Sequence, residues 1–368
     1  MTQGTEAGSH DLDAGEIRAL LILMGLPKVG PVVLNRLIRR FGSAGAALAA
    51  DWRSFHRVAG PRFSGRDLRT SSENLARAEE GLTRIRRSGA TVRLRGSPGF
   101  PPGLEAADTP PAAIFLRGRP EIVERPGIAI VGSRLATETG RDLSRRLAGA
   151  IAACGRPVVS GLARGIDAAA HRGALAAGGP TVAVLGCGVD VAYPRMNLRI
   201  FRKIAKEGAL VSEFAPGEGA APHHFPRRNR IIAALSEVVV VVEAGRKSGA
   251  MITVEHALRQ GKDVWVAPGP AGASGWLGGR ALIAEGATRL ESIDEFITRT
   301  CGGPARPEEP ALPPEEAALF ARLGSEPVSV DELASGPEDV PRTLCVLATL
   351  EVDGLVESCP GAQFRRSR

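Results

Sequence analysis

The sequence is poor in cysteine and contains no long hydrophobic run, and both absences restrict what the protein can be. Its five cysteines among 368 residues are scattered and form no CxxC pair. This usage argues against a disulfide framework and a zinc site, and it fits the reducing cytoplasm. No apolar run approaches the about 20 residues of a membrane-spanning helix, and the N-terminus lacks a basic-then-apolar signal. We expect a soluble, cytoplasmic protein without a membrane partner or a metal site.

The net charge of +7 is distributed unevenly along the chain. Residues 14–80 carry 11 basic and 6 acidic side chains, and residues 81–300 carry 30 and 19. Residues 315–368 carry 5 and 10. A basic body favours a polyanionic partner, and an acidic end favours a protein partner. Moderately basic proteins without such a partner are also common, so charge alone does not decide.

Composition and periodicity divide the chain into five parts. Residues 1–13 are polar and unpatterned, and we expect them to be disordered. Helical periodicity predicts a helical domain over 14–88, and alternating strand and helix patterns predict an α/β domain over 89–300. A Pro/Gly-rich linker is expected at 301–314. Three helical segments and a hairpin over 315–368 indicate a winged helix.

Two smaller features leave alternatives open. Leu26–Gly30 (LPKVG), between two predicted helices, resembles a helix-hairpin-helix turn, whose backbone N–H groups can hold a DNA phosphate. A simple turn between packed helices explains it equally well. The supposed recognition helix of the winged helix contains one arginine, Arg342, and two acids, Glu351 and Asp353. This argues against binding in a DNA groove and favours protein contact or packing.

The middle of the chain predicts a doubly wound parallel sheet. Apolar strand candidates fall at 128–131, 157–159, 181–185, 209–212, 238–242 and 263–267, and helical patterns separate them. Each strand ends in small or polar residues: GSR, SGLARG, GCG, SEFAPG, EAGRKSG and APGP. Ligands of such sheets bind beyond the carboxyl ends of the strands, where these turns gather.

These turns are suited to bind phosphate. Backbone N–H groups at a helix start have no partner inside the helix, and the helix dipole favours an anion there. Glycine and serine allow close approach, and neighbouring cations supply charge. The predicted phosphate-binding residues are Gly132, Ser133, Arg134, Ser160, Gly161, Arg164, Gly165, Arg228, Arg230, Lys247, Ser248, Gly249 and Thr253.

A nucleotide cofactor is poorly supported. The first turn reads G-S-R instead of G-x-G-x-x-G, and no acid near the end of the second strand is placed to hold a ribose hydroxyl. The P-loop spacing G-x-x-x-x-G-K-S is also absent. We therefore expect no bound cofactor.

Catalytic patterns are equally thin, and we expect no catalytic residue. None of the turn serines is in a G-x-S-x-G elbow. Asp167 and His171 share one helix face, but an N-cap and a core histidine explain them better than an acid–base pair. His223-His224 has no third metal ligand nearby. The best enzymatic alternative is a nucleotide-processing hydrolase with Glu243 or Glu255 as its carboxylate, although the PGG-x-GT run of such enzymes is missing.

A row of phosphate-binding turns suits a polynucleotide better than one mononucleotide, which needs only one or two. Aromatic residues are scarce, with 3 Trp, 1 Tyr and 11 Phe, so a long base-stacking platform is not expected. Phe225, beside the arginine cluster, and Trp276, in a Gly-rich loop, are candidates for one or two stacked bases. Both are equally well explained as core residues.

The ordered motifs GSR, SGLARGID, TVAVLGCGVDVAYPRMN, SEF, FPRRNRII and EAGRKSGAMIT resemble the DNA-processing protein A family of bacteria (DprA, also called Smf). The resemblance covers essentially the whole chain. It implies a sterile-alpha-motif-like helical domain, an extended Rossmann domain and a winged helix. It also implies sequence-independent binding of single-stranded DNA, homodimer formation, and loading of the RecA recombinase in natural transformation.

The resemblance places the strand's phosphates on most of the turn residues above and brings Asn229 of FPRRNRII into the same site. The chain departs from the family pattern in one loop. Arg280 stands where the segment G-x-N-x-L-I usually has its Asn, and Pro270 follows the PG turn. We expect this last loop to contact DNA differently or not at all.

Overall fold

The computed structural model describes residues 14–61, 63, 69–270, 273–302, 313–324, 326–352 and 355–366. The predicted disordered tail, residues 303–312 of the predicted linker, and Asp353 lie outside these residues. The chain forms two units, Met1–Pro304 and Ala305–Arg368. The predicted boundary between residues 88 and 89 falls inside the first unit, and it stays a prediction.

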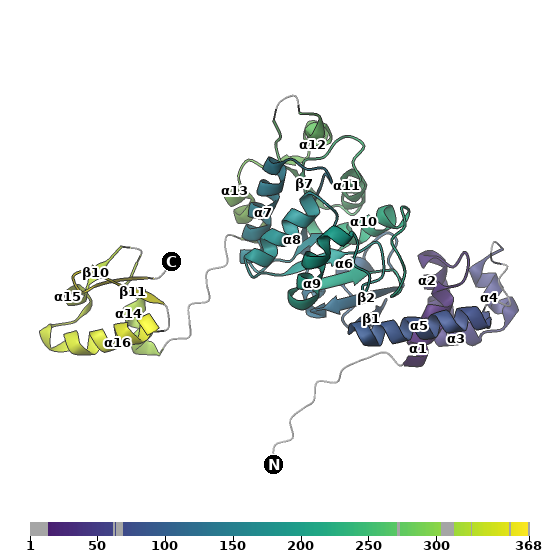
Figure 1. The fold of residues 1–368 in the computed structure, drawn as a ribbon, viewed down its shortest axis with the longest axis horizontal. Coiled ribbons are helices and arrows are strands. Elements are labelled where there is room, and N and C mark those ends of the chain that lie inside the picture. The colour runs from purple at the N-terminus through teal and green to yellow at the C-terminus, as the bar shows by residue number, and fades with distance from the viewer. Residues whose placement is uncertain are drawn as a thin grey trace, which may run out of the picture. The chain divides into compact units, whose positions relative to one another are not determined.

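The first unit begins with five helices that surround a small core of Leu20, Leu23, Leu37 and Phe55. Short polar side chains start three of the helices: Ser43, Asp51 and Ser71 each accept a hydrogen bond from a backbone N–H one turn ahead. The helices are α1 (Ala14–Met24), α2 (Pro31–Phe41), α3 (Ala44–Ala49), α4 (Trp52–Ala59) and α5 (Ser72–Ser88). In Figure 1 they gather beside strand β1.

The rest of the first unit is a nine-stranded sheet in the order β1-β2-β6-β5-β4-β3-β7-β8-β9. Strands β3 to β9 are parallel to their neighbours, and β1 and β2 add an antiparallel edge. This confirms the predicted doubly wound α/β fold. The strands are β1 (Thr91–Leu94), β2 (Ala113–Gly118), β3 (Gly127–Gly132), β4 (Val158–Ser160), β5 (Thr181–Val184), β6 (Ala209–Ser212), β7 (Ser236–Val242), β8 (Asp263–Val266) and β9 (Thr288–Arg289).

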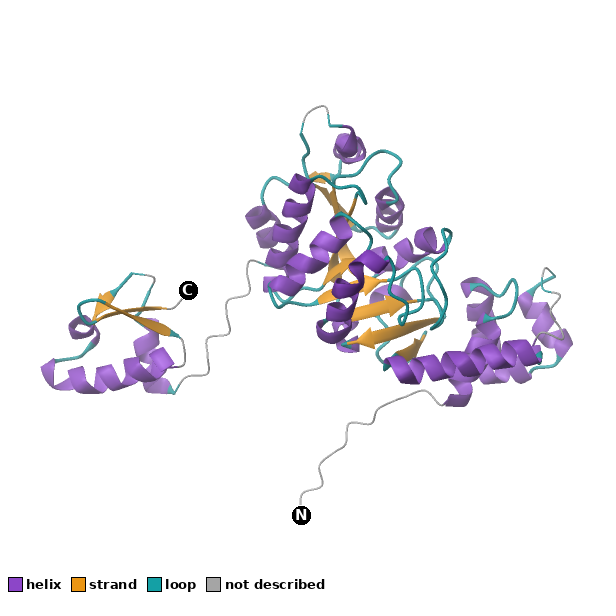
Figure 2. Ribbon diagram, viewed as in Figure 1, coloured by secondary structure: helices purple, strands orange, loops and turns teal. Residues whose placement is uncertain are grey.

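Helices cover both faces of this sheet (Figure 2). One face packs on α7 (Glu138–Ala153), α8 (Ile166–Ala176), α9 (Leu198–Glu207) and α13 (Ile293–Cys301). The other packs on α6 (Pro102–Glu105), α10 (His224–Ala234), α11 (Ala250–Arg259) and α12 (Leu277–Ala284). The chain builds β3 to β6 on one side and then returns to place β7 beside β3. The topological switch point, where doubly wound sheets bind ligands, is therefore between β3 and β7.

The second unit has the elements of a winged helix, as predicted. Its core contains Phe320, Leu347, Leu350 and Phe364. The elements are α14 (Pro314–Ala321), β10 (Val328–Ser329), α15 (Val330–Leu333), α16 (Val340–Val352), β11 (Val356–Cys359) and β12 (Gln363–Arg366), with the strands in the order β10-β12-β11. Among the described residues of either unit, no helix combines the length and apolarity needed to cross a membrane.

Candidate functional site

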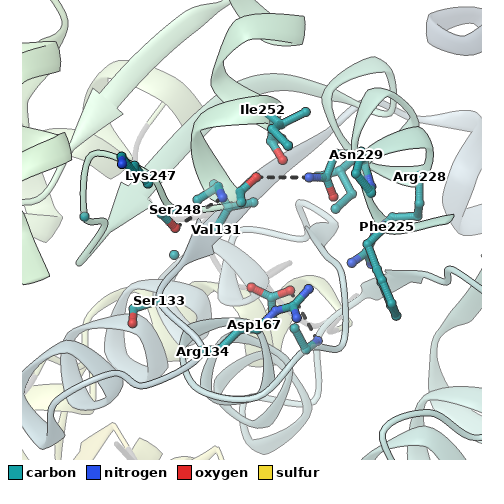
Figure 3. Close-up of a pocket in the computed structure, with 18 of the residues that line it drawn as sticks. Val131, Ser133, Arg134, Asp167, Phe225, Arg228, Asn229, Lys247, Ser248 and Ile252 are labelled. Carbon is teal, nitrogen blue, oxygen red and sulfur yellow. Dashed lines mark hydrogen bonds between the residues drawn. The ribbon is translucent and has the colours of Figure 1, made fainter. Parts of the chain in front are cut away.

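A cavity of about 810 Å³ opens at the switch point of the sheet, and we call it the crest cavity. Three segments far apart in the sequence supply most of its lining (Figure 3): the loop after β3, the first half of α10, and the loop between β7 and α11. Its lining includes Gly132, Ser133, Arg134, Leu135, Asp167, Tyr193, Phe225, Arg228, Asn229, Lys247, Ser248, Gly249 and Thr253. The predicted gathering of Gly/Ser turns at this edge is thus present in the structure.

Glu243 holds the loop after β3 in place. The Ser133 N–H donates to the Glu243 carbonyl oxygen at 2.8 Å. The Glu243 carboxylate accepts from the Thr137 N–H at 2.8 Å and from the Thr137 hydroxyl at 2.7 Å. Glu243 is 3% exposed and has a positive φ of 50°, a conformation that a non-glycine residue adopts only where the surroundings require it. Its carboxylate is therefore already used to position the loop and is not directed at a substrate.

Arg134 lies over an aromatic pair at the mouth of the cavity. Its guanidinium carbon is 5.3 Å from the Phe225 ring centroid, and that ring is 5.6 Å from the Tyr193 ring at an angle of 35°. Tyr193 is 46% exposed. We call Arg134, Tyr193 and Phe225 the aromatic shelf, because a planar group can stack on such surfaces. Sequence reasoning found Phe225 and missed Tyr193, whose one signal is that it is the single tyrosine of the chain.

A second, smaller cavity of about 60 Å³ lies next to the shelf. It shares Arg134, Tyr193, Phe225 and Arg228 with the crest cavity, and it adds the predicted residues Gly161 and Arg164. Gly165, with φ of 75°, packs directly against the Ser133 carbonyl, where a Cβ would clash. Glycine at this position therefore lets the turns after β3 and β4 approach each other.

Arg228 and Asp167 are both buried below the cavity, where each is held by backbone groups. The Arg228 guanidinium donates to the carbonyl oxygens of Gly161 and Val184. The Asp167 carboxylate accepts from the N–H groups of Gly161 and Ala163 at 3.1 and 3.3 Å. Burial lowers the pKa of Arg228 to about 10, so it stays charged at neutral pH. Burial raises the pKa of Asp167, and the Arg228 charge opposes that rise.

The loop before α11 is the third segment of the cavity lining. The Asn229 side chain donates to the Gly249 carbonyl at 3.1 Å, and the Ser248 hydroxyl accepts from the Ala250 N–H at 3.3 Å. Lys247 is exposed on this loop. Among the lining residues Asp167 is the one carboxylate, set against Arg134, Arg228 and Lys247. The crest cavity therefore has a net positive lining that suits an anion.

Three predicted side chains are buried and engaged inside the protein. Ser160 is fully buried, and its hydroxyl donates to the Ile130 carbonyl at 2.7 Å. Arg230 is 8% exposed, because its guanidinium pairs with buried Glu213 and donates to the Thr109 carbonyl. Trp276 is 3% exposed and packs in the core, so it offers no ring face to a base. Thr253 lines the cavity but is 1% exposed.

The weaker catalytic and metal patterns resolve into structural roles. The His171 Nδ1 pairs with the Thr181 hydroxyl at 2.8 Å, and burial lowers its pKa to about 3. Because the Thr181 hydroxyl donates to the Val158 carbonyl, Nδ1–H is the donor in this pair. Glu255 is exposed and ion-paired with Arg259. Within the part of the chain that the structure describes, no group of His, Cys, Asp and Glu side chains is arranged to hold a metal ion.

The loop between Pro270 and Arg280, where the sequence departs from the expected pattern, packs against the turn that follows β7. The Gly278 N–H donates to the Ala244 carbonyl at 2.8 Å, and a Cβ at Gly278 would clash with the backbone of residues 244 and 245. The Arg280 side chain donates to the Ala273 carbonyl at 3.2 Å. Whether this loop contacts a ligand stays a prediction.

Comparison with known proteins gives one consistent result. The sequence profile described as "DNA recombination-mediator protein A" matches residues 91–300, and that of the DprA winged helix domain matches residues 303–362. Protein Smf of Escherichia coli (strain K12) is 36% identical over 282 residues, which are 73% of this chain and 75% of that protein.

Two solved structures share the fold. The crystal structure of DNA processing protein A from Streptococcus pneumoniae superposes with a TM-score of 0.66 and 29% identity, covering 79% of this chain and 98% of that one. DNA processing protein A from Helicobacter pylori, whose structure is described for its single-stranded DNA binding mode, superposes with a TM-score of 0.53 and 28% identity. That match covers 57% of this chain and 94% of the other.

Proposed function

The chain belongs to the DNA recombination-mediator protein A family, and we propose that it binds single-stranded DNA without sequence preference along the carboxyl edge of its sheet. The observation that carries this proposal is the positive crest cavity, with three cations and one internally engaged carboxylate in its lining. The single-stranded DNA binding of the H. pylori relative supports it.

The geometry supports contacts to phosphate and not to base edges. Ser133 and Arg134 on one side of the cavity and Lys247, Ser248 and Gly249 on the other are the proposed phosphate contacts. Such contacts carry no sequence information, because every nucleotide has the same backbone. The aromatic shelf adds a stacking surface, which is equally tolerant of sequence because every base has a flat face.

We further propose that the protein is not an enzyme. The two carboxylates of the hydrolase alternative are both otherwise engaged: Glu243 holds Thr137, and Glu255 pairs with Arg259 on an exposed helix face. The proposed protein partners are the RecA recombinase, which the protein loads onto bound strands, and a second copy of this chain. Family membership supports these partners and a cytoplasmic location.

Binding of oligo(dT) measured by fluorescence anisotropy over a salt series tests the function. We expect the affinity to fall steeply with salt, as it does when phosphate contacts release counterions, and to be similar for different base sequences. Binding that is insensitive to salt would contradict the proposal. Incubation with nucleoside monophosphates distinguishes DNA binding from the enzymatic alternative, since release of free base would indicate a hydrolase.

A further inference from the structure

The outer faces of α2 and α4 carry a concentration of arginines that the crest cavity does not use. Between residues 31 and 59 the sequence has five arginines and a single acid, Asp51. All five are exposed, and none forms an ion pair with another residue that the structure describes. These residues, which we call the outer basic face, are Arg36, Arg39 and Arg40 of α2 and Arg53 and Arg57 of α4.

Helix geometry explains why these side chains point to solvent together. In α2, Leu34 and Leu37 are buried; at about 100° per residue Arg36 and Arg39 lie on the opposite side, with Arg40 at its edge. In α4, Phe55 is buried, and the arginines follow one another four residues apart on the opposite side. Helix α2 packs against α4, so the two arginine rows are on neighbouring helices.

The charges of α5 are arranged differently. Several of its charges are in ion pairs: Arg18 with Glu79 at 2.6 Å, Arg77 with Glu73 at 2.9 Å, and Arg84 with Glu80 at 2.7 Å. The first part of α5 is therefore neutralised and its exposed Arg86 and Arg87 are confined to the last turn, whereas none of the five arginines of α2 and α4 has an ion pair with a described residue. A general bias toward arginine would give both surfaces the same character.

The outer basic face is connected to the crest cavity through one loop. Asn35 of α2 donates from its side chain to the Pro110 carbonyl at 2.8 Å. Arg230 of α10 donates to the carbonyl of the preceding residue, Thr109, at 2.6 Å. The same helix α10 places Phe225 and Asn229 in the cavity. The loop at residues 109 and 110, next to the exposed acid Asp108, therefore contacts both α10, which lines the cavity, and α2.

We propose that the outer basic face is a second binding site for the phosphodiester backbone of DNA, which continues the path of the strand from the crest cavity. Planar, permanently charged guanidinium groups match phosphate oxygens and need no base contacts. Its occupant is the flanking part of the same single strand, and a neighbouring duplex, which presents the same phosphate chemistry, is the alternative that the test separates. This inference rests on the proposed function of the crest cavity only for the continuity of the path.

The triple variant R36Q/R39Q/R40Q tests the site, with oligo(dT) of about 6 and about 30 nucleotides and a duplex of about 30 base pairs as probes. We expect the variant to bind the short strand like the unmodified protein. Its affinity for the long strand should fall roughly tenfold, and its salt slope by about 2, since each single-strand phosphate contact contributes about 0.7. An additional loss on the duplex would identify duplex as the ligand, and an unchanged duplex affinity would identify the flanking single strand.

A matched control removes the same charge from α5, in R77Q/R86Q/R87Q. This control should change long-strand binding little, because the α5 surface is not on the path. Equal losses in both triple variants, or an unchanged affinity and salt slope in R36Q/R39Q/R40Q, would overturn the second site. A different result would show that the crest cavity does not bind DNA: the Arg134→Ala variant would then bind the short strand as well as the unmodified protein does. Thermal unfolding of each variant shows whether the fold is retained.

Discussion

The sheet of the first unit and the winged helix of the second differ in charge at the surface where each fold usually binds its ligand. Doubly wound sheets commonly hold a single nucleotide, and winged helices commonly place a basic helix in a DNA groove. Here the sheet edge gathers Arg134, Arg228 and Lys247. The described part of α16 carries one arginine, Arg342, and one acid, Glu351, and residues 315–368 hold 5 basic and 10 acidic side chains.

The difference teaches that charge, more than fold class, separates the proposed polyanion site from the winged helix. A recognition helix needs several cations to approach phosphate and base edges, and α16 does not supply them. The sheet edge supplies cations together with backbone N–H groups at helix starts. We therefore expect the second unit to contact protein, as its acidity predicts.

Loss of both exposed cations of the crest cavity should have the largest effect. In the double variant R134A/K247A, each removed charge-assisted contact is worth at least about 1.5 kcal/mol, so we expect roughly 100-fold or more weaker binding of oligo(dT) for every sequence. The salt slope should fall by about 1.4, for two single-strand contacts. Anisotropy titrations at several salt concentrations measure both. If the double variant bound DNA as well as the unmodified protein, the sheet edge would not be the DNA site and the contrast with the winged helix would fail.

Weakening the support of the GSR loop should have the next largest effect. Glu243→Gln replaces a charged acceptor of two Thr137 hydrogen bonds by an amide, and we expect a loss of about 1–3 kcal/mol in unfolding free energy. DNA affinity should fall as well, because the loop carries Ser133 and Arg134. Denaturant unfolding and anisotropy measure the two effects. The exposed control Glu255→Gln should stay within about 0.5 kcal/mol, and a similar loss there would contradict the assigned role.

Acid should destabilise the first unit through His171. Its pKa is lowered from 6.5 to about 3 in the folded protein, so between these values the unfolded chain binds more protons. Stability from this residue is complete above pH 6.5 and falls by about 1.4 kcal/mol per unit as the pH decreases toward 3. Tryptophan fluorescence follows this unit alone, since Trp52, Trp265 and Trp276 all belong to it.

The variant His171→Asn provides the comparison for the acid effect. It keeps a donor for Thr181 and cannot take up the proton, so its unfolding free energy should depend less steeply on pH. The second unit contains no histidine, so it should not share this dependence. An unchanged pH slope in the variant would show that another group causes the acid effect.

Removal of residues 305–368 should have the smallest effect on DNA binding. Because this segment is acidic, we expect the shortened protein to bind oligo(dT) within a few-fold of the full chain. The same anisotropy titration measures it, with R134A/K247A as the reference for a real loss. Weakening by about tenfold or more would assign DNA contact to the winged helix and end the contrast between the two units.

The fold class and most of the cavity-lining loops could be predicted from the sequence, because both depend on local patterns. Strand, small-residue turn and helix follow one another within short segments, and parallel strands bring their carboxyl ends to one edge. The strand order could not be predicted in the same way. The placement of β7 beside β3, which creates the switch point, depends on which long-range pairing buries the most apolar surface.

The predicted side chains that lie buried, and the one lining residue that was missed, have one physical cause in common. Arg230 and Ser160 lie in the right motifs, but their side chains turn inward, Arg230 toward buried Glu213 and Ser160 toward the Ile130 carbonyl. Trp276 fills a core position whose neighbours come from other elements. Tyr193 was missed because its contact with Phe225 joins segments that are 32 positions apart. Side-chain direction depends on partners distant in sequence, which periodicity does not describe.

The sequence by itself determined that this chain forms a parallel sheet whose Gly/Ser turns end at one basic edge, because periodicity, turn residues and charge are local properties. The tertiary structure decided which cations of that edge remain available. Arg134 and Lys247 face the cavity, whereas Arg228 and Arg230 are drawn inward by backbone carbonyls and by Glu213. A buried guanidinium must satisfy its hydrogen bonds inside the protein, and only the folded arrangement shows where those partners are.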